Sequence, residues 1–140
     1  NMQISDIAYI AGLFDGEGSI DYAKRYKKIG NRRSLTWNIL MRIQMTDESV
    51  LRWVHETLKV GTIRKKNRSP SIKSHWKDSW IYSVRYRQAY HVCKLLWPFA
   101  QVKLHKIEQI IDHYEPDTQD LGDNVVDLAL ERERRNDTVR

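Results

Sequence analysis

The chain has 140 residues, of which 41% are hydrophobic, with a net charge of +6 and a single cysteine. This length suits one domain with a hydrophobic core, and we expect no second one. One cysteine excludes an intramolecular disulfide, and the sequence has neither an apolar run of membrane-spanning length nor a charged-then-apolar signal segment. We therefore expect a soluble, intracellular protein, with the compartment left open between an organelle and a prokaryotic or phage host.

The charge is distributed unevenly along the chain. Residues 1–20 carry three acids and no bases, residues 21–106 carry 20 Lys and Arg against 5 Asp and Glu, and residues 107–140 carry 4 against 10. The central segment is therefore +15, between flanks of −3 and −6. A basic segment interleaved with aromatic residues is typical of a phosphate-binding surface, and the alternative is a solvated basic face.

The first predicted element is a helix with two distinct strips. Its core face is predicted from helical spacing at Ile7, Ile10, Ala11 and Phe14. The second strip consists of Ala8, Gly12 and Gly16, which recur every four residues. Because a glycine within a helix costs about 1 kcal/mol relative to alanine, this strip suggests close packing of a partner helix.

The helix is predicted to end at Asp15-Gly16-Glu17-Gly18. A carboxylate at a helix C-terminus faces the negative end of the helix dipole, which is unfavourable unless a cation or a donor is present. A divalent metal supplies both. The alternative is a helix followed by a glycine-rich turn, in which Asp15 and Glu17 are merely solvated.

Two hairpins are predicted in the basic segment. The first joins strands at 20–28 and 35–45 through a turn at Gly30-Asn31, and the second joins strands at 62–68 and 78–86 through a polar loop at 67–77. In the second strand, apolar residues from Leu35 to Met45 alternate with polar ones, so one face is core. Tyr26 is expected on the core face of the first strand, and Ile81 on the exposed face of the last.

Helices are predicted between and after the hairpins. One starts at Asp47 and runs to Gly61, and another spans 88–97 before Pro98 breaks it. A further helix at 99–114 is expected to turn four residues towards the core: Val102, Ile107, Ile110 and Ile111. We divide the chain into a domain at 1–116 and an acidic tail at 117–140, with a short helix at 124–135.

The fold class is therefore α+β, with a four-stranded antiparallel sheet, helices on one face and polar side chains on the other. Arginine and lysine pair with guanine edges, and asparagine and glutamine with adenine edges, so this polar face is suited to reading DNA. The alternative is an ordinary amphipathic sheet with a solvated face. The predicted DNA-binding residues are Arg25, Lys27, Arg32, Arg33, Asn38, Arg42, Gln44, Arg64, Lys66, Arg68, Ser79, Ser83 and Arg85.

The sequence has no motif for a histidine zinc site or for a nucleotide-phosphate loop. The five histidines lack zinc-ligand spacing, and no Gly-x-x-x-x-Gly-Lys phosphate loop is present.

The segment from Ile10 to Gly18 resembles the signature of the LAGLIDADG homing endonucleases, with all nine positions identical or conservative. In that family the signature helices of two subunits or domains pack together, and the second acidic residue binds the catalytic metal. The resemblance implies that Glu17 is a metal ligand and that Gly16 adds its backbone carbonyl. It also implies a helix–helix interface made by Ala8, Ala11, Gly12 and Asp15.

A second stretch, 97–103, is similar to the family's aromatic-flanked proline followed by an active-site lysine. The resemblance implies that Lys103 is a catalytic base or charge stabiliser, whereas the sequence without it favours a surface lysine. Asp47 aligns with a position where relatives organise active-site water. Its alternative role is the helix N-cap, and one side chain can serve both roles.

The resemblance covers residues 7–114 and implies one αββαββα unit with a single signature. It therefore implies a homodimer that cleaves double-stranded DNA at a long, roughly palindromic target, from an intron-encoded gene. The implied cofactor is Mg²⁺, with Mn²⁺ or Ca²⁺ as substitutes in binding, and neither a membrane nor a small-molecule substrate is expected. The alternatives are an RNA maturase or a DNA-binding protein of the same fold without cleavage, and thirdly a protein-interaction role.

Overall fold

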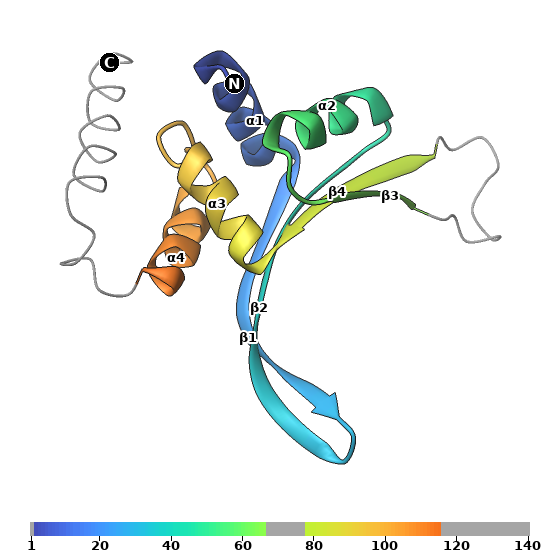
Figure 1. The fold of residues 1–140 in the computed structure, drawn as a ribbon, viewed down its shortest axis with the longest axis vertical. Helices are drawn as coiled ribbons and strands as arrows, with labels where there is room; N and C mark the ends of the chain where they lie inside the picture. Colours follow the sequence, from blue (N-terminus) through green and yellow to red (C-terminus); the bar gives the residue numbers. More distant parts are fainter. Residues whose placement is uncertain (1, 67–77, 116–140) are drawn as a thin grey trace.

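The computed structural model describes residues 2–66 and 78–115, which form four helices and a four-stranded antiparallel sheet (Figure 1). The order confirms the predicted α+β fold. The elements are α1 (Ile4–Glu17), β1 (Gly18–Ile29), β2 (Arg32–Met45), α2 (Glu48–Leu58), β3 (Thr62–Lys66), β4 (Ser79–Arg85), α3 (Tyr86–Leu96) and α4 (Leu104–Tyr114).

The strands are ordered β1-β2-β4-β3, so that β2 and β4 are central. The first hairpin is in register from Gly18 opposite Ile43 to Ile29 opposite Arg32. Its two-residue turn begins with Gly30 at φ 63°, a left-handed conformation that glycine adopts without strain. The predicted turn at Gly30-Asn31 is therefore confirmed.

The hydrophobic core lies between the helices and one face of the sheet. Ile39, Met41 and Ile43 on β2 are buried, while Arg42 and Gln44 between them are exposed, so the period-two alternation predicts the two faces correctly. From α1, Ile10 and Phe14 are fully buried in the same cluster. From the remaining elements the cluster includes Leu51, Val54, Leu58, Tyr82, Val84, Ala89, Val92, Cys93, Leu96, Ala100, Ile107 and Ile110.

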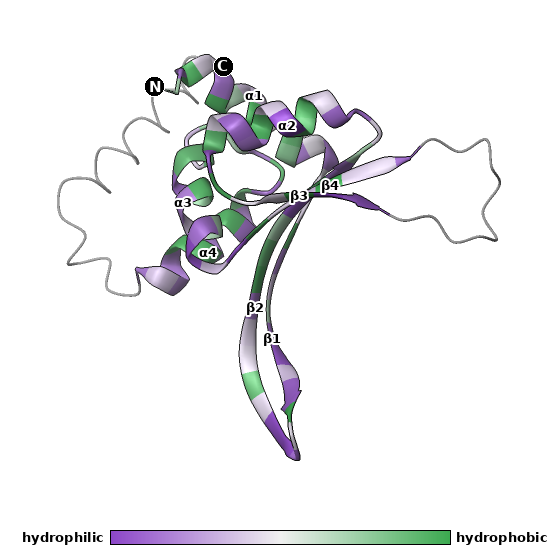
Figure 2. Cartoon of the chain, turned by 45° about the vertical axis from the view of Figure 1, so that its right-hand side comes forward, coloured by the Kyte–Doolittle hydropathy of each residue, from purple (hydrophilic) through white to green (hydrophobic). Residues whose placement is uncertain are grey.

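The first hairpin extends well beyond the helices that cover the rest of the sheet (Figure 1). Tyr26 is 67% exposed and Leu35 is 50% exposed, although alternation assigned both to the core face. The prediction is wrong for these residues because none of the four described helices covers that end of the hairpin, where Figure 2 shows largely hydrophilic residues. The core side of the hairpin ends at Tyr22 and Trp37, whose rings stack at 4.6 Å.

Two boundaries differ from the predicted ones. β4 ends at Arg85 because Tyr86 takes a left-handed φ of 53° and starts α3, and its side chain is exposed. α4 starts at Leu104, not near residue 99, and Val102 is 72% exposed and does not face the core. The cause is a contact with α1, described below.

The polar face of the sheet contains one buried apolar residue. Ile81 of β4 is 4% exposed and lies between Gln44 of β2 and Arg64 of β3 in the strand register. The expectation that Ile81 is exposed is therefore wrong. We attribute its burial to the long polar side chains on either side, whose aliphatic stems cover apolar surface.

Three predicted features lie outside the described residues. They are the end of the third strand with its loop at 67–77, the tail at 117–140 and the short helix at 124–135. Within residues 2–66 and 78–115, no helix is long and apolar enough to cross a membrane.

We expect Gly18→Ala to lower the free energy of unfolding. A Cβ at this position would lie 2.7 Å from Cδ1 and 2.8 Å from the carbonyl oxygen of Phe14. Overpacking of this kind costs about 1–3 kcal/mol. Urea denaturation measures the change, and the exposed neighbour Ser19→Ala is the control, expected within about 0.5 kcal/mol of wild type. Equal stability of the two variants would contradict the packing of α1 against the start of β1.

Candidate active site and nucleic-acid interface

The candidate active site lies where α1 ends and β1 begins. Glu17 is the last residue of α1, and both it and Gly16 are exposed. Glu17 lines a groove of about 370 Å³ together with Gln44, Met45, Thr46 and Ser79. The groove thus places the predicted metal ligand next to Gln44 and Ser79, two predicted DNA-binding residues.

Asp15, in the last turn of α1, binds the segment that precedes α4. One carboxylate oxygen accepts a hydrogen bond from the backbone N–H of Gln101 at 2.8 Å, and the other accepts from the N–H of Lys103 at 3.0 Å. Donors at the start of α4 also carry the positive end of its helix dipole. The unfavourable carboxylate at the end of α1 is therefore satisfied by backbone donors.

This contact corrects the expected start of α4. The carboxylate of Asp15 is bound within its own chain, and its place in a helix–helix interface stays a prediction. The N–H of Lys103 is bound to Asp15, whereas a helix starting at residue 99 would direct it to the carbonyl of Phe99. The N–H groups of Phe99 and Ala100 close on Leu96 O at the end of α3. α4 accordingly begins at Leu104, and Val102 faces solvent.

Lys103 lies at the same end of α1. Its half-buried side chain donates from Nζ to the backbone carbonyl of Asp15 at 3.3 Å, and this carbonyl belongs to the negative end of the α1 dipole. The segment before it is fixed by a hydrogen bond from Trp97 Nε1 to Glu108 at 3.1 Å and by a turn that closes on Leu96 O. Lys103 and Glu17 are thus both at the C-terminal end of α1.

Asp47 follows the groove residue Thr46 and caps α2. Its Oδ1 accepts from Ser49 Oγ at 2.7 Å and from the N–H of Val50 at 3.2 Å. The hydrogen bonds from Ser49 and Val50 hold the pKa of Asp47 below its ordinary value. The predicted N-cap is confirmed, and the role of Asp47 in ordering water stays a prediction.

The glycine strip of α1 is open in the single chain. A Cβ added at Gly12 or Gly16 would meet nothing within 4 Å, and both residues are exposed. Ala8 is half-buried, whereas Ala11 is 1% exposed and belongs to the core of its own chain. The open strip of the single chain therefore consists of Ala8, Gly12 and Gly16, and the place of Ala11 in an interface stays a prediction.

Most of the predicted DNA-binding residues lie on the sheet face opposite the helices. Arg33 is an exception, because it lies on the other face of the hairpin, 5.0 Å from the ring of Tyr26. Arg68 is outside the described residues. Those on the polar face are Arg25, Lys27, Arg32, Asn38, Arg42, Gln44, Arg64, Lys66, Ser79, Ser83 and Arg85.

Hydrogen bonds connect neighbouring strands on this face and add residues that the sequence reading missed. Arg42 Nε donates to Ser19 Oγ at 3.1 Å, and Gln44 Nε2 donates to Ser79 Oγ at 3.2 Å. Asp21 accepts from Arg25 and Asn38. Alternation places both Ser19 and Asp21 on the polar face, so the signal was present, but neither is a cation or an amide of the kind that usually contacts DNA.

The predicted metal ligands are few in one chain. The residues at 2–66 and 78–115 contain no group of three or more His, Cys, Asp or Glu that could hold a metal ion. Glu17 and the carbonyl of Gly16 are hard oxygen donors at an exposed helix end, which fits Mg²⁺ or Ca²⁺ when water, phosphate or a second chain completes the ligand set. The residues therefore fit a shared metal site.

The chain matches the model of the LAGLIDADG endonuclease family over residues 10–123. This match spans most of the chain, and the protein belongs to the LAGLIDADG endonuclease family. The family that the signature at Ile10 to Gly18 predicted is thus confirmed.

Solved structures of homing endonucleases share the fold. The homing endonuclease I-CvuI matches with a TM-score of 0.64 and 17% identity, over 93% of this chain and 79% of that one. The archaeal intron-encoded homing endonuclease I-Vdi141I matches with a TM-score of 0.59 and 20% identity, over 93% and 83%. The LAGLIDADG homing endonuclease I-SmaMI matches with a TM-score of 0.61 and 13% identity, over 94% of this chain but 44% of that one.

We expect Asp15→Ala to destabilise the protein by about 2–4 kcal/mol, because two backbone donors lose a charged acceptor. Native-state hydrogen exchange should show faster exchange of the Gln101 and Lys103 amides. The control is Asp6→Ala, an acid in the first turn of the same helix, which should leave both amides unchanged. Unchanged exchange in Asp15→Ala would contradict the link between α1 and α4.

Proposed function

We propose that this protein is a site-specific DNA endonuclease that uses a divalent metal and acts as a homodimer. The observation that carries the proposal is the position of Glu17, which is exposed in a groove at the edge of a sheet face covered with cations and amides. A carboxylate there meets a phosphate bound on that face. I-CvuI and I-Vdi141I, which share the fold, have been solved in complex with DNA.

A divalent ion would be held by Glu17 and by the carbonyl of Gly16, and it supplies charge stabilisation and a more acidic bound water. Mg²⁺ is the proposed cofactor, and I-CvuI structures with DNA were solved in the presence of Mg and of Ca. The ammonium group of Lys103 lies at the same end of α1. Its positive charge stabilises the negative charge that develops on the phosphate during cleavage. Asp47 accepts hydrogen bonds next to the groove and orders water there.

The proposed homodimer would supply a second signature helix and a second Glu17. One chain has one signature helix, one Glu17 and an open glycine strip on α1. Close approach of two α1 helices along Ala8, Gly12 and Gly16 brings two Glu17 residues near one axis and completes the shared metal site. Two identical reading faces related by that axis then bind a roughly palindromic target.

Incubation of the protein with a randomised DNA library and Mg²⁺, followed by sequencing of the cut ends, tests the function. Cleavage at one long, roughly palindromic sequence supports the proposal. Binding without cleavage would favour the alternative, a DNA-binding protein or an RNA maturase of the same fold. Binding alone requires only the cationic face of the sheet. A matched RNA library identifies the maturase.

Glu17→Gln should abolish cleavage and leave DNA binding largely intact. The substitution removes the proposed metal-binding charge at nearly constant shape, and Glu17 belongs to the end of α1 and not to the strands that carry the predicted DNA-binding side chains. Single-turnover cleavage and a binding titration in Ca²⁺ separate the two effects. Glu56→Gln on α2 is the control and should cleave like wild type. Wild-type cleavage by Glu17→Gln would remove Glu17 from the metal site.

Gly12→Leu should convert the dimer to a monomer and abolish cleavage of both strands. The single chain has space for the side chain, since nothing lies within 4 Å of a Cβ at Gly12, so only a partner helix is displaced. Leucine is also the better helix former, by about 1 kcal/mol relative to glycine, so the monomer should not lose stability. Sedimentation velocity measures the oligomeric state, with Gly12→Ala as a smaller step. A dimeric and active Gly12→Leu protein would show that α1 is not the interface.

A further inference from the structure

The cationic face of the sheet contains one carboxylate, that of Asp21. Within the four strands as the structure describes them, Asp21 is the only acidic residue, and it shares its face with Arg25, Lys27, Arg42 and Arg64. A negative charge on a surface that binds phosphates weakens binding to every DNA sequence. We therefore expect Asp21 to have a role that offsets this loss of affinity.

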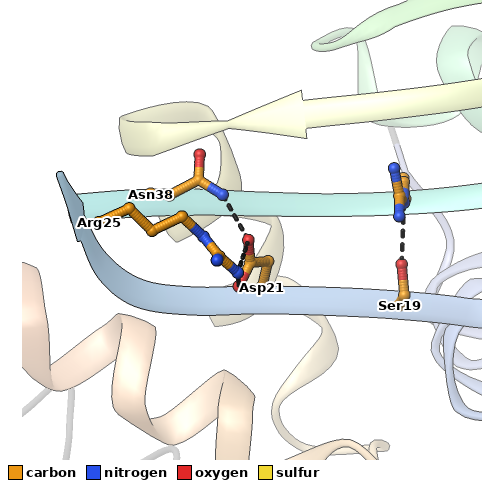
Figure 3. Close-up of polar contacts among 5 residues, drawn as sticks. Ser19, Asp21, Arg25 and Asn38 are labelled. Atoms are coloured by element: carbon orange, nitrogen blue, oxygen red, sulfur yellow. Dashed lines mark hydrogen bonds and ion pairs between the residues drawn. The ribbon is translucent and has the colours of Figure 1, made fainter. Parts of the chain in front are cut away.

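Asp21 joins two of the predicted DNA-binding residues. Arg25 Nη2 lies 3.1 Å from each carboxylate oxygen of Asp21, and Asn38 Nδ2 donates to Oδ2 from the neighbouring strand (Figure 3). Asn38 is opposite Ala23 in the hairpin register, so the contact to Asp21 is diagonal across β1 and β2. The three side chains form one cluster, which we name the Asp21 cluster: Asp21, Arg25 and Asn38.

The charge of Asp21 determines how the amide of Asn38 is oriented. Burial by itself raises the pKa of Asp21, but hydrogen bonds from Arg25 and Asn38 and the charges of Arg25 and Lys106 outweigh it, so the pKa lies below its ordinary value. An ionised carboxylate only accepts hydrogen bonds, so Asn38 must turn its NH₂ group towards Asp21. Figure 3 shows the carbonyl oxygen of Asn38 turned away from Asp21.

We infer that Asp21 is a specificity-determining residue that fixes Asn38 with its carbonyl outward, so that Asn38 reads a base carrying an exocyclic amino group in the major groove. Adenine N6 and cytosine N4 are the two such donors there. The hydrogen bond to Asp21 uses one of the two N–H donors of Asn38 and leaves the second N–H and the carbonyl oxygen for a base. Adenine can accept the second N–H at N7 and donate from N6, whereas cytosine offers only its N4 donor. This inference rests on the proposed function, because it requires that the sheet face reads DNA.

The same contacts limit Arg25. Its Nη2 group is held by both oxygens of Asp21, which competes with bidentate pairing to guanine through that nitrogen. The side chain of Arg25 is 61% exposed and that of Asp21 is 34% exposed, and an ion pair this exposed contributes little to stability. The effect of Asp21 is therefore expected in base preference more than in folding.

The test compares relative affinities of wild type and Asp21→Ala for targets that carry each base pair at every half-site position, at one salt concentration. In wild type, adenine should be preferred over cytosine about tenfold at the position that Asn38 contacts, the discrimination expected of a bidentate pair. In Asp21→Ala, the amide of Asn38 is released and can turn either end towards the DNA, so the preference for adenine over cytosine at that position should fall. Asp21→Asn, which is nearly isosteric, should shift in the same direction by less and serves if the alanine variant does not fold.

Two controls separate positioning from charge. In an Asn38→Ala background, Asp21→Ala should no longer change the preference between adenine and cytosine. Asp78→Ala removes an acid that pairs with Lys65 at 2.9 Å. This variant should change the affinity for all DNA sequences by the same factor. A uniform change in Asp21→Ala, or an unchanged profile, overturns the inference while the proposed function stands. A wild-type protein with no base preference at any position overturns the proposed function as well.

Discussion

The hydrogen bonds from Gln101 and Lys103 to Asp15 connect the two ends of the folded unit. The carboxylate lies between the negative end of the α1 dipole and the positive end of the α4 dipole, and it is stable there because two backbone donors satisfy it. The contact places Lys103 beside the last turn of α1, which ends at Glu17. The relative position of Glu17 and Lys103, two of the three predicted catalytic residues, thus depends on the side chain of Asp15.

The sheet separates the tasks of stability and recognition between its two faces. The helices cover one face over the central part of the sheet, and the first hairpin extends past them with Tyr26 exposed on one side and basic residues on the other (Figures 1 and 2). A long two-stranded ribbon of this kind suits a DNA groove. On the polar face, contacts such as the Asp21 cluster hold side chains by charge and hydrogen bonding in place of packing.

The candidate active site offers few ligands for a metal ion in one chain. Glu17 and the Gly16 carbonyl are exposed, and the described residues contain no group of three metal-binding side chains. Under the proposed function, the remaining ligands come from another copy and from the DNA itself, so that metal binding, dimerisation and target recognition depend on one another. This coupling would restrict cleavage to the assembled complex, and an isolated chain would not hydrolyse DNA.

The sequence by itself determined the features that depend on near neighbours. These are the signature helix from its helical spacing, the two faces of β2 from alternation at Ile39 to Gln44, the N-cap at Asp47 and the family from Ile10 to Gly18. Tertiary structure decided the rest, because the partners are distant in the chain. Asp15 binds donors 86 and 88 residues away, which shortened α4 and exposed Val102. Helix coverage decided that Tyr26 is exposed, and neighbouring strands decided that Ile81 is buried and that Asp21 restrains Asn38, since no local pattern records which side chains meet across a sheet.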